Sequence, residues 1–363
     1  MREIRAEKRG QVAIVSIIFL FGIFFGINFS NVGGYLMADT LQSKESEILT
    51  ETRPFEPQQD INLFQSDIIG EKSSMEELVM FALEQVNADR LEHGLTPVKL
   101  GSNPAAQYHV EDMMAFGYFS HWNTNGVKPY VSYTEHGGLA SVKENIAASC
   151  CEGFSCEMEP FELIKKFQHL MVYDDAESNW GHRDNILDPN HSLVNIGITW
   201  DDNNFYFAQH FETKLIDFKK INLSNEKILE ISGRMPDGYR LKSISMFQDD
   251  RPLSLNGNDL ESNSPYDQNF YDSGIFSGIL VSEPMLFEFY EECQKDKILV
   301  SSKSQEWCIP YETYGKIDKD NKIELAVDVS KLLNPNGIHT IYINLENPNG
   351  DNVVATSLTL EYL

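Results

Sequence analysis

Residues 192–212 read SLVNIGITWDDNNFYFAQHFE, and apolar and polar side chains alternate along both ends of this segment. Alternation with a period of two is typical of a half-buried β-strand, so residues 192–200 and 205–212 are predicted to form two strands. The four residues between them, DDNN, are typical of a turn, which would pair the strands as an antiparallel hairpin. Because helical patterns precede this hairpin, we expect an α+β fold with helices packed on an antiparallel sheet.

Three segments upstream of the hairpin show the apolar spacing of amphipathic helices. The first covers residues 74–94 and begins at a capping box, in which Glu77 reaches back to the N-cap Ser74. The second starts at Asn103-Pro104, with the proline suited to the first turn of a helix, and stops near Gly117, and the third follows Pro160. The residues expected on their buried faces are Val79, Ala82, Leu83 and Val86, then Ala106, Val110 and Met113, then Phe161, Ile164, Phe167 and Met171.

Several short motifs follow one another along residues 74–213. In chain order they are Asn87-x-x-Arg90-x-x-x-Gly94-x-x-Pro97, Asp112-Met113, Phe119-Ser120-His121, Glu144-Asn145-Ile146-Ala147, Gly181-His182-Arg183-Asp184-Asn185-Ile186-Leu187, Asn195-Ile196-Gly197-Ile198 and Ala208-Gln209-His210-Phe211. In this order they resemble the motifs of the CAP superfamily, which includes cysteine-rich secretory proteins, antigen 5 allergens, plant pathogenesis-related proteins and bacterial and archaeal extracytoplasmic relatives. The resemblance implies a three-layer α-β-α sandwich for residues 74–213.

Three polar residues of these motifs are candidate metal ligands. His121, Glu144 and His182 lie in loops or at the ends of predicted elements, where functional side chains are often held by a rigid scaffold. Two neutral imidazoles and a carboxylate suit a borderline cation such as Zn²⁺, and three protein ligands leave one position for water. The resemblance implies a cavity lined by two histidines and two acidic residues, and these three match three of the four. The family's W-x-x-E helix motif is missing before the second histidine, so the fourth position has three candidates, Asp174, Asp175 and Glu177.

Other histidines are interpreted from their place in the pattern. His109 and His169 fall within amphipathic helices and are interpreted as packing or surface residues. His210 alternates with Phe211 on its strand, so it is expected on the opposite side of the sheet, where it could approach the cavity.

Residues 214–363 alternate in the manner of strands separated by turns. The expected strands are residues 227–232, 241–247, 286–290, 298–301, 323–329, 339–345 and 353–362, with Asn-Gly turn dipeptides at 256–257, 336–337 and 349–350. Such a series of short strands without a helical stripe predicts an all-β, Ig-like sandwich. A domain of this kind on an exported protein is expected to serve in recognition or as a spacer.

The N-terminus predicts export. Residues 1–10 hold four basic and two acidic side chains, and the following residues 12–27 form an uncharged apolar run. The length of this run lies between that of a signal-peptide core and that of a membrane-spanning helix. Residues 1–38 are therefore predicted to be a cytoplasmic leader with a transmembrane anchor, or a cleaved signal. The polar, acidic residues 39–73 are predicted to be a linker.

The charge balance and the cysteines are consistent with that location. The chain of 363 residues carries 29 Lys and Arg against 55 Asp and Glu, a formal charge of −26, which argues against nucleic acid as a partner. Five cysteines fit an oxidising compartment. A local disulfide is expected within the set Cys150, Cys151 and Cys156, and Cys293 with Cys308 could close a second loop.

The sequence is compatible with three functions. The first is a membrane-tethered extracytoplasmic protein that binds a lipid, an envelope polymer or a protein, with a His/Glu cavity for a divalent metal such as zinc. The second is a metal-dependent hydrolase in which Glu144 acts as base toward water on a metal held by His121 and His182. The third is a structural cell-surface protein. Since no H-E-x-x-H, G-x-S-x-G, P-loop or G-x-G-x-x-G motif occurs, binding is favoured over catalysis.

Overall fold

The computed structural model describes residues 74–150, 159–262, 274–281, 297–301, 306–310 and 321–362. Within these ranges no helix is both long enough and apolar enough to span a membrane. The predicted anchor at residues 12–27 and the predicted linker at residues 39–73 lie outside them. The described residues belong to one compact unit that contains both helices and sheets, which confirms the α+β class.

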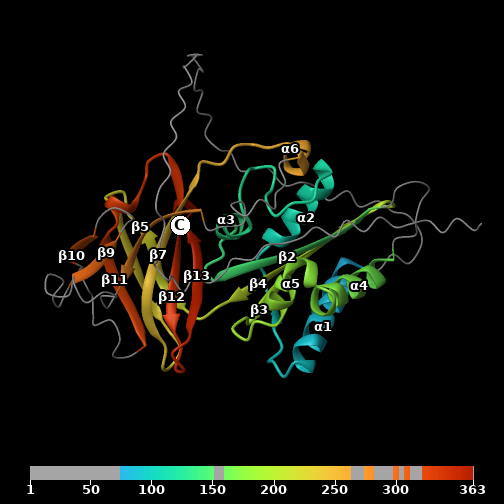
Figure 1. Cartoon of the computed structure of the whole chain (residues 1–363), viewed down its shortest axis with the longest axis horizontal. Coiled ribbons are helices and arrows are strands. Elements are labelled where there is room, and N and C mark those ends of the chain that lie inside the picture. Colours follow the sequence, from blue (N-terminus) through green and yellow to red (C-terminus); the bar gives the residue numbers. More distant parts are fainter. Residues whose placement is uncertain are drawn as a thin grey trace, which may run out of the picture. The chain divides into compact units, whose positions relative to one another are not determined.

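A four-stranded sheet runs through the helix-containing part of this unit (Figure 1). Its order is β1-β3-β4-β2, with β1 at Lys99–Leu100, β2 at Ser141–Cys150, β3 at Leu193–Trp200 and β4 at Asn204–Thr213. The predicted hairpin is present, because β3 and β4 are antiparallel and their last pair is Trp200 with Phe205. β4 also pairs with β2 along its full length, in a register that sets Glu144 opposite His210.

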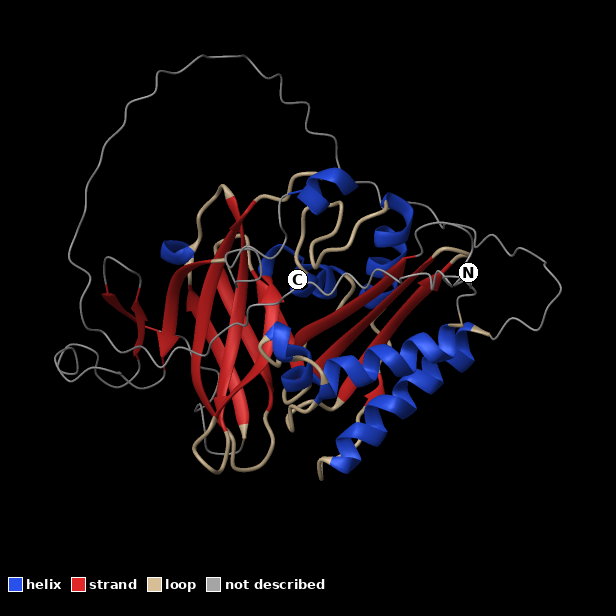
Figure 2. Ribbon diagram, turned by 45° about the vertical axis from the view of Figure 1, so that its right-hand side comes forward, coloured by secondary structure: helices blue, strands red, loops and turns tan. Residues whose placement is uncertain are grey.

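Helices cover both faces of this sheet (Figure 2). The three predicted helices are α1 (Met75–Glu92), α2 (Ala105–Phe116) and α4 (Pro160–Tyr173), while the shorter α3 (Pro129–Glu135), α5 (Gly181–Ile186) and the 3₁₀ turn η1 (Ala176–Ser178) were not expected. One face packs on α1 and α4 through Leu78, Val86, Ile164, Ile198 and Phe207. The other face packs on α2 through Ala106, Val110, Met113, Ile146 and Ala208.

The contact between α2 and the sheet is close. A Cβ added at Gly197 would lie 2.2 Å from the Ala106 carbonyl oxygen, so this strand position accepts no side chain. Gln107 adds a pair of hydrogen bonds to β3, donating to the Ile198 carbonyl at 3.0 Å and accepting from the Ile198 amide at 3.0 Å. The position of α2 over the sheet is therefore fixed along its length.

Two antiparallel sheets form the rest of the unit. The larger has the order β10-β9-β8-β7-β12-β13 and the smaller β11-β6-β5. Their bounds are β5 Asp217–Leu223, β6 Ile228–Arg234, β7 Arg240–Asp250, β8 Ile275–Val281, β9 Lys297–Ser301, β10 Glu306–Pro310, β11 Lys322–Asp328, β12 Gly337–Glu346 and β13 Asn352–Thr359. Leu229, Ile231 and Leu325 from the smaller sheet share one core with Ile244, Ile341 and Ile343 from the larger.

Most of the predicted strands in this part are present. The strand expected at residues 286–290 lies outside the described residues, and β5, β8 and β10 were not expected. The expectation of an all-β region is wrong at α6 (Gly257–Ser262), a short helix that follows β7. Leu260 of α6 packs with residues of α2 and its neighbours. An Ig-like topology stays a prediction.

The helix-containing and strand-rich parts contact each other through buried polar groups. Asp249 on β7 accepts hydrogen bonds from Lys128 Nζ at 2.6 Å and from the Tyr130 hydroxyl at 2.7 Å. The Leu255 amide donates to the Thr124 carbonyl at 2.8 Å. A boundary between separate domains at residue 213 stays a prediction.

Cys150 is exposed at the end of β2 and forms no disulfide within the described residues. Three of the other cysteines, Cys151, Cys156 and Cys293, lie outside those residues, so both expected disulfides stay predictions. Cys308 is on β10.

Candidate metal centre

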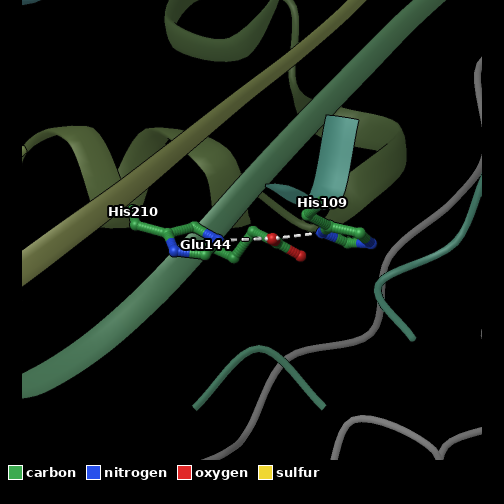
Figure 3. A group of neighbouring side chains, drawn as sticks. All are labelled: His109, Glu144 and His210. Carbon is green, nitrogen blue, oxygen red and sulfur yellow. Dashed lines mark hydrogen bonds and ion pairs between the residues drawn. The ribbon is translucent and has the colours of Figure 1, made fainter. Parts of the chain in front are cut away.

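The candidate site is built on the face of the sheet that α2 covers. Glu144 on β2 and His210 on β4 are cross-strand partners, and both share their face with Ile146 and Ala208. His109 on α2 lies one helical turn from Ala106 and Met113, which are both buried against this face. The three side chains therefore meet between helix and sheet, and Figure 3 shows His109 and His210 on either side of Glu144.

Three imidazoles contact the Glu144 carboxylate. His109 Nδ1 lies 2.7 Å and His210 Nε2 lies 2.6 Å from Oε2, while His121 Nδ1 lies 2.5 Å from Oε1. Because an ionised carboxylate can only accept hydrogen bonds, each of these ring nitrogens is the donor. The ligand atoms of His109, Glu144 and His210 lie within 4.8 Å of one another, which is close enough to hold a metal ion.

The cluster is shielded from water. The side chain of Glu144 is 0% exposed, and those of His121, His210 and His109 are 2%, 1% and 6% exposed. Burial raises the pKa of Glu144, but the charge and hydrogen bond of His109 and the hydrogen bonds of the other two histidines outweigh it, so the pKa lies well below its usual range. The carboxylate is therefore ionised at neutral pH.

The pKa values of His109 and His121 are shifted in opposite directions. Burial lowers the pKa of His109, yet the charge of Glu144 and its hydrogen bond reverse the direction and the pKa is raised. Burial also lowers the pKa of His121, where the nearby His109 and His182 add to the effect and Glu144 only partly offsets it, so the net shift is downward. His109 is thus the better proton carrier, and His121 is the ring that is neutral at pH 7.

His182 has a carboxylate partner of its own. It lies in the first turn of α5, and its Nδ1 is 2.6 Å from Asp175 Oδ1. Asp175 also accepts from the Ser178 hydroxyl and, at 3.1 Å, from the Arg183 amide. Burial raises the pKa of Asp175, but His182 and these donors outweigh it and the pKa is lowered.

The contact between His182 and Asp175 concerns the fourth residue of the expected cavity, for which Asp174, Asp175 and Glu177 are the candidates. Asp175 is buried beside His182, while Asp174 and Glu177 are exposed. Among the three candidates, Asp175 is therefore the one whose carboxylate reaches a candidate metal ligand.

Amide side chains hold the two His–carboxylate pairs together. Asn185 on α5 donates to the Glu144 carbonyl at 3.3 Å and to Asn145 Oδ1 at 2.9 Å. Asn145 in turn donates to the His182 carbonyl at 3.1 Å. The structure thus places His121, Glu144 and His182 in one region, with Glu144 hydrogen-bonded to His121 and with Asp175 paired to His182.

Two histidines extend the predicted set. His210 approaches the site from the side opposite Phe211, as expected from the strand alternation. His109, interpreted as a packing or surface residue, is buried on α2, and its ring also contacts Glu144. In the sequence, the spacing of His109 from Ala106, Val110 and Met113 already indicates that it lies on the inward face of α2. His169 is exposed, which is consistent with its interpretation as a surface residue.

A cavity of about 400 Å³ occurs elsewhere in the described structure. It lies near α3 and the start of β5, and its lining includes Tyr133, Glu212 and Phe218. None of the histidines of the candidate site lines it.

No model of a protein family matches the chain, and no curated protein matches it. Among solved structures, an extracellular protein with an SCP domain from Bacillus anthracis str. Ames is 21% identical, with a TM-score of 0.30, and the match covers 38% of this chain and 41% of that one. An outer surface protein from Borrelia burgdorferi is 11% identical, with a TM-score of 0.31 and coverages of 40% and 100%. The CAP domain of enterococcal PrgA is 17% identical, with a TM-score of 0.29 and coverages of 39% and 63%.

Two of these proteins are named for an SCP or CAP domain, the class that the motifs of residues 74–213 resemble. The chain is similar to that class of protein. It spans less than half the length of the Bacillus anthracis protein.

Proposed function

We propose that the chain is a membrane-tethered, extracytoplasmic binding protein in which His121 and His182 hold a divalent transition metal such as Zn²⁺. The observation that carries the proposal is that each imidazole is held through Nδ1 by a separate buried carboxylate, Glu144 in one case and Asp175 in the other. When Nδ1 donates, the neutral ring presents the lone pair of Nε2. Carboxylate–histidine pairs of this kind orient the ligands of many metal sites.

The arrangement supports binding better than hydrolysis. A hydrolase would need a base beside the metal-bound water, and the predicted base was Glu144. Both oxygens of that carboxylate accept hydrogen bonds from imidazoles, and its side chain is 0% exposed. Glu144 is therefore suited to positioning His121, whereas His182, at 12% exposure, is the more accessible ligand of the pair.

The proposed location and ligand class rest on the sequence. Basic residues precede the apolar run at residues 12–27, and a strongly acidic remainder follows it. A membrane anchor with the folded part outside the cytoplasm fits this order. The ligand is proposed to be a lipid, an envelope polymer or a protein, with the strand-rich part serving in recognition or as a spacer.

The zinc content of the purified full chain tests this proposal. We expect His121→Ala combined with His182→Ala to remove one equivalent of zinc relative to the wild type, because both proposed ligands of that ion are gone. Inductively coupled plasma mass spectrometry after desalting measures the content.

The matched control removes two histidines elsewhere in the fold. His136 bonds a helix carbonyl on α3 and His169 stacks on Tyr173, so replacing both with alanine should leave the zinc content unchanged. Equal zinc in the wild type and in the His121/His182 variant would show that these residues hold no metal. If peptide hydrolysis by the wild type were found and were absent from that variant, the hydrolase would replace the binding protein as the better account.

A further inference from the structure

Three imidazoles contact Glu144, which is more than the charge of one carboxylate requires. A single protonated histidine neutralises one carboxylate, yet three ring nitrogens lie within 2.7 Å of its oxygens. Two of them, from His109 and His210, contact the same oxygen. These two residues lie outside the pair of histidines in the proposed function.

A second negative charge, in addition to that of Glu144, acts on His109. Asp112, one turn further along α2, acts electrostatically on the same ring. Asp112 accepts from the Tyr118 hydroxyl and from the amide and hydroxyl of Thr124, and all of these donors are neutral. Two carboxylates therefore act on this buried region, and a divalent cation matches their combined charge.

We propose that His109 Nδ1, Glu144 Oε2 and His210 Nε2 form a second, deeper binding site for a divalent transition cation of the zinc class. Two imidazole nitrogens and one carboxylate oxygen are a donor set that zinc favours, and the three residues each offer a ligand atom within 4.8 Å of the other two. They come from α2, β4 and β2, so the site ties one helix to two strands of the sheet.

The scaffold holds these ligands in place before any ion binds. Glu144 and His210 face each other in the β2–β4 ladder. The register of α2 is set by the contact of Gly197 with Ala106 and by the two hydrogen bonds of Gln107. Ligands fixed on rigid elements in this way lose little entropy when they bind an ion.

Binding requires only a small rearrangement. Bonds of about 2.1 Å to zinc place neighbouring ligands of a tetrahedral site about 3.4 Å apart. The present contacts of 2.7 Å and 2.6 Å must widen by roughly 0.7–0.8 Å to reach that separation. Each ligating nitrogen gives up its proton, either to solvent or to the other nitrogen of its ring, so that a lone pair faces the ion.

The burial of the site predicts its role. The side chains of its three residues are 6% exposed or less. Three protein ligands leave a fourth tetrahedral position, but at this depth substrate does not reach the ion, and an ion that substrate does not reach stabilises the fold. The second ion would thus be structural, and Glu144 would link it to the proposed outer ion by accepting from His121 through Oε1.

The zinc stoichiometry of the full chain and of two double variants tests this inference separately from the proposed function. We expect two equivalents in the wild type and one in His109→Gln combined with His210→Gln. We also expect one equivalent in the His121/His182 alanine variant, because the deeper ligands remain there. The His136/His169 control should keep both ions.

The outcomes distinguish the two sites. A folded His109/His210 variant that keeps the zinc content of the wild type would overturn this inference and leave the proposed function standing. Conversely, if only the His109/His210 variant lost zinc, the outer site would be wrong and the deeper site right. A chain without zinc in any form would overturn both.

A second measurement does not depend on whether the His109/His210 variant folds. Zinc K-edge absorption spectroscopy on the His121/His182 alanine variant observes the deeper site alone. We expect a first shell that contains two imidazole nitrogens and a carboxylate oxygen. The absence of bound zinc in this folded variant, or a shell without imidazole, would overturn the inference.

Discussion

Replacing Glu144 with glutamine is expected to lower the free energy of unfolding by about 3–5 kcal/mol, the usual effect of removing one partner from a buried ion pair. The amide has no charge to balance a protonated His109, and its NH₂ group would face ring N–H donors. Since the side chain is 0% exposed, water cannot replace the lost interactions. Urea unfolding at pH 7 measures the change, and zinc content measured in parallel should fall to zero or one equivalent.

The matched control for this variant is Glu84→Gln. Glu84 is an exposed residue of α1, so its replacement should change stability by no more than about 0.5 kcal/mol. The pKa of Glu144 is depressed in the folded protein, so its contribution to stability is complete above the ordinary value of 4.5 and declines as the pH falls further. The difference between wild type and variant should therefore shrink in acid. A loss below about 1 kcal/mol at pH 7 would contradict the role of Glu144 as the hub of a buried cluster.

Replacing Arg90 with methionine is expected to cost about 4 kcal/mol of stability, because buried hydrogen bonds to charged groups are strong and their acceptors would be left unpaired. Arg90 is fully buried, and its guanidinium donates to four backbone carbonyls. These acceptors are Thr96 at 3.0 Å, Ile186 at 2.7 Å, Asp188 at 2.9 Å and His191 at 3.4 Å. The residue thereby ties the end of α1 to the segment between α5 and β3.

Two further variants show whether the effect comes from this set of contacts. Arg251→Met removes an exposed guanidinium that donates to the Pro335 carbonyl, and it should change stability by no more than about 0.5 kcal/mol. Arg90→Lys keeps the charge but lacks the planar fork, so it should recover only part of the loss. Thermal and urea unfolding measure all three. Equal losses for Arg90→Met and Arg251→Met would contradict the account.

The elements that could be predicted from the sequence are those with a long, regular pattern. The helices α1, α2 and α4 and the β3–β4 hairpin each repeat their apolar spacing several times, and each is present. The helices α3 and α5 span seven and six residues, too short for such a pattern to show. The short helix α6 forms because Leu260 packs on a distant part of the chain, which local spacing does not report.

Only part of the candidate site was expected from the sequence, because His109, which contacts Glu144, was interpreted as a packing or surface residue. Motif order brought together His121, Glu144 and His182, and strand alternation oriented His210. Which carboxylate contacts which imidazole depends on the β2–β4 register and on the position of α2 on the sheet. Both are set by contacts between residues that are far apart in the sequence. The burial of Asp175 in preference to its acidic neighbours depends on local backbone turns between α4 and α5, where Asn179 and Trp180 have positive φ.

The location of the metal tests the central claim most directly. Crystals of the chain grown with zinc, and measured on both sides of the zinc absorption edge, give an anomalous difference map that places each ion. We expect one peak bonded by the imidazoles of His121 and His182, and a second between His109, Glu144 and His210. A map at saturating zinc with no peak at His121 and His182 would contradict that claim.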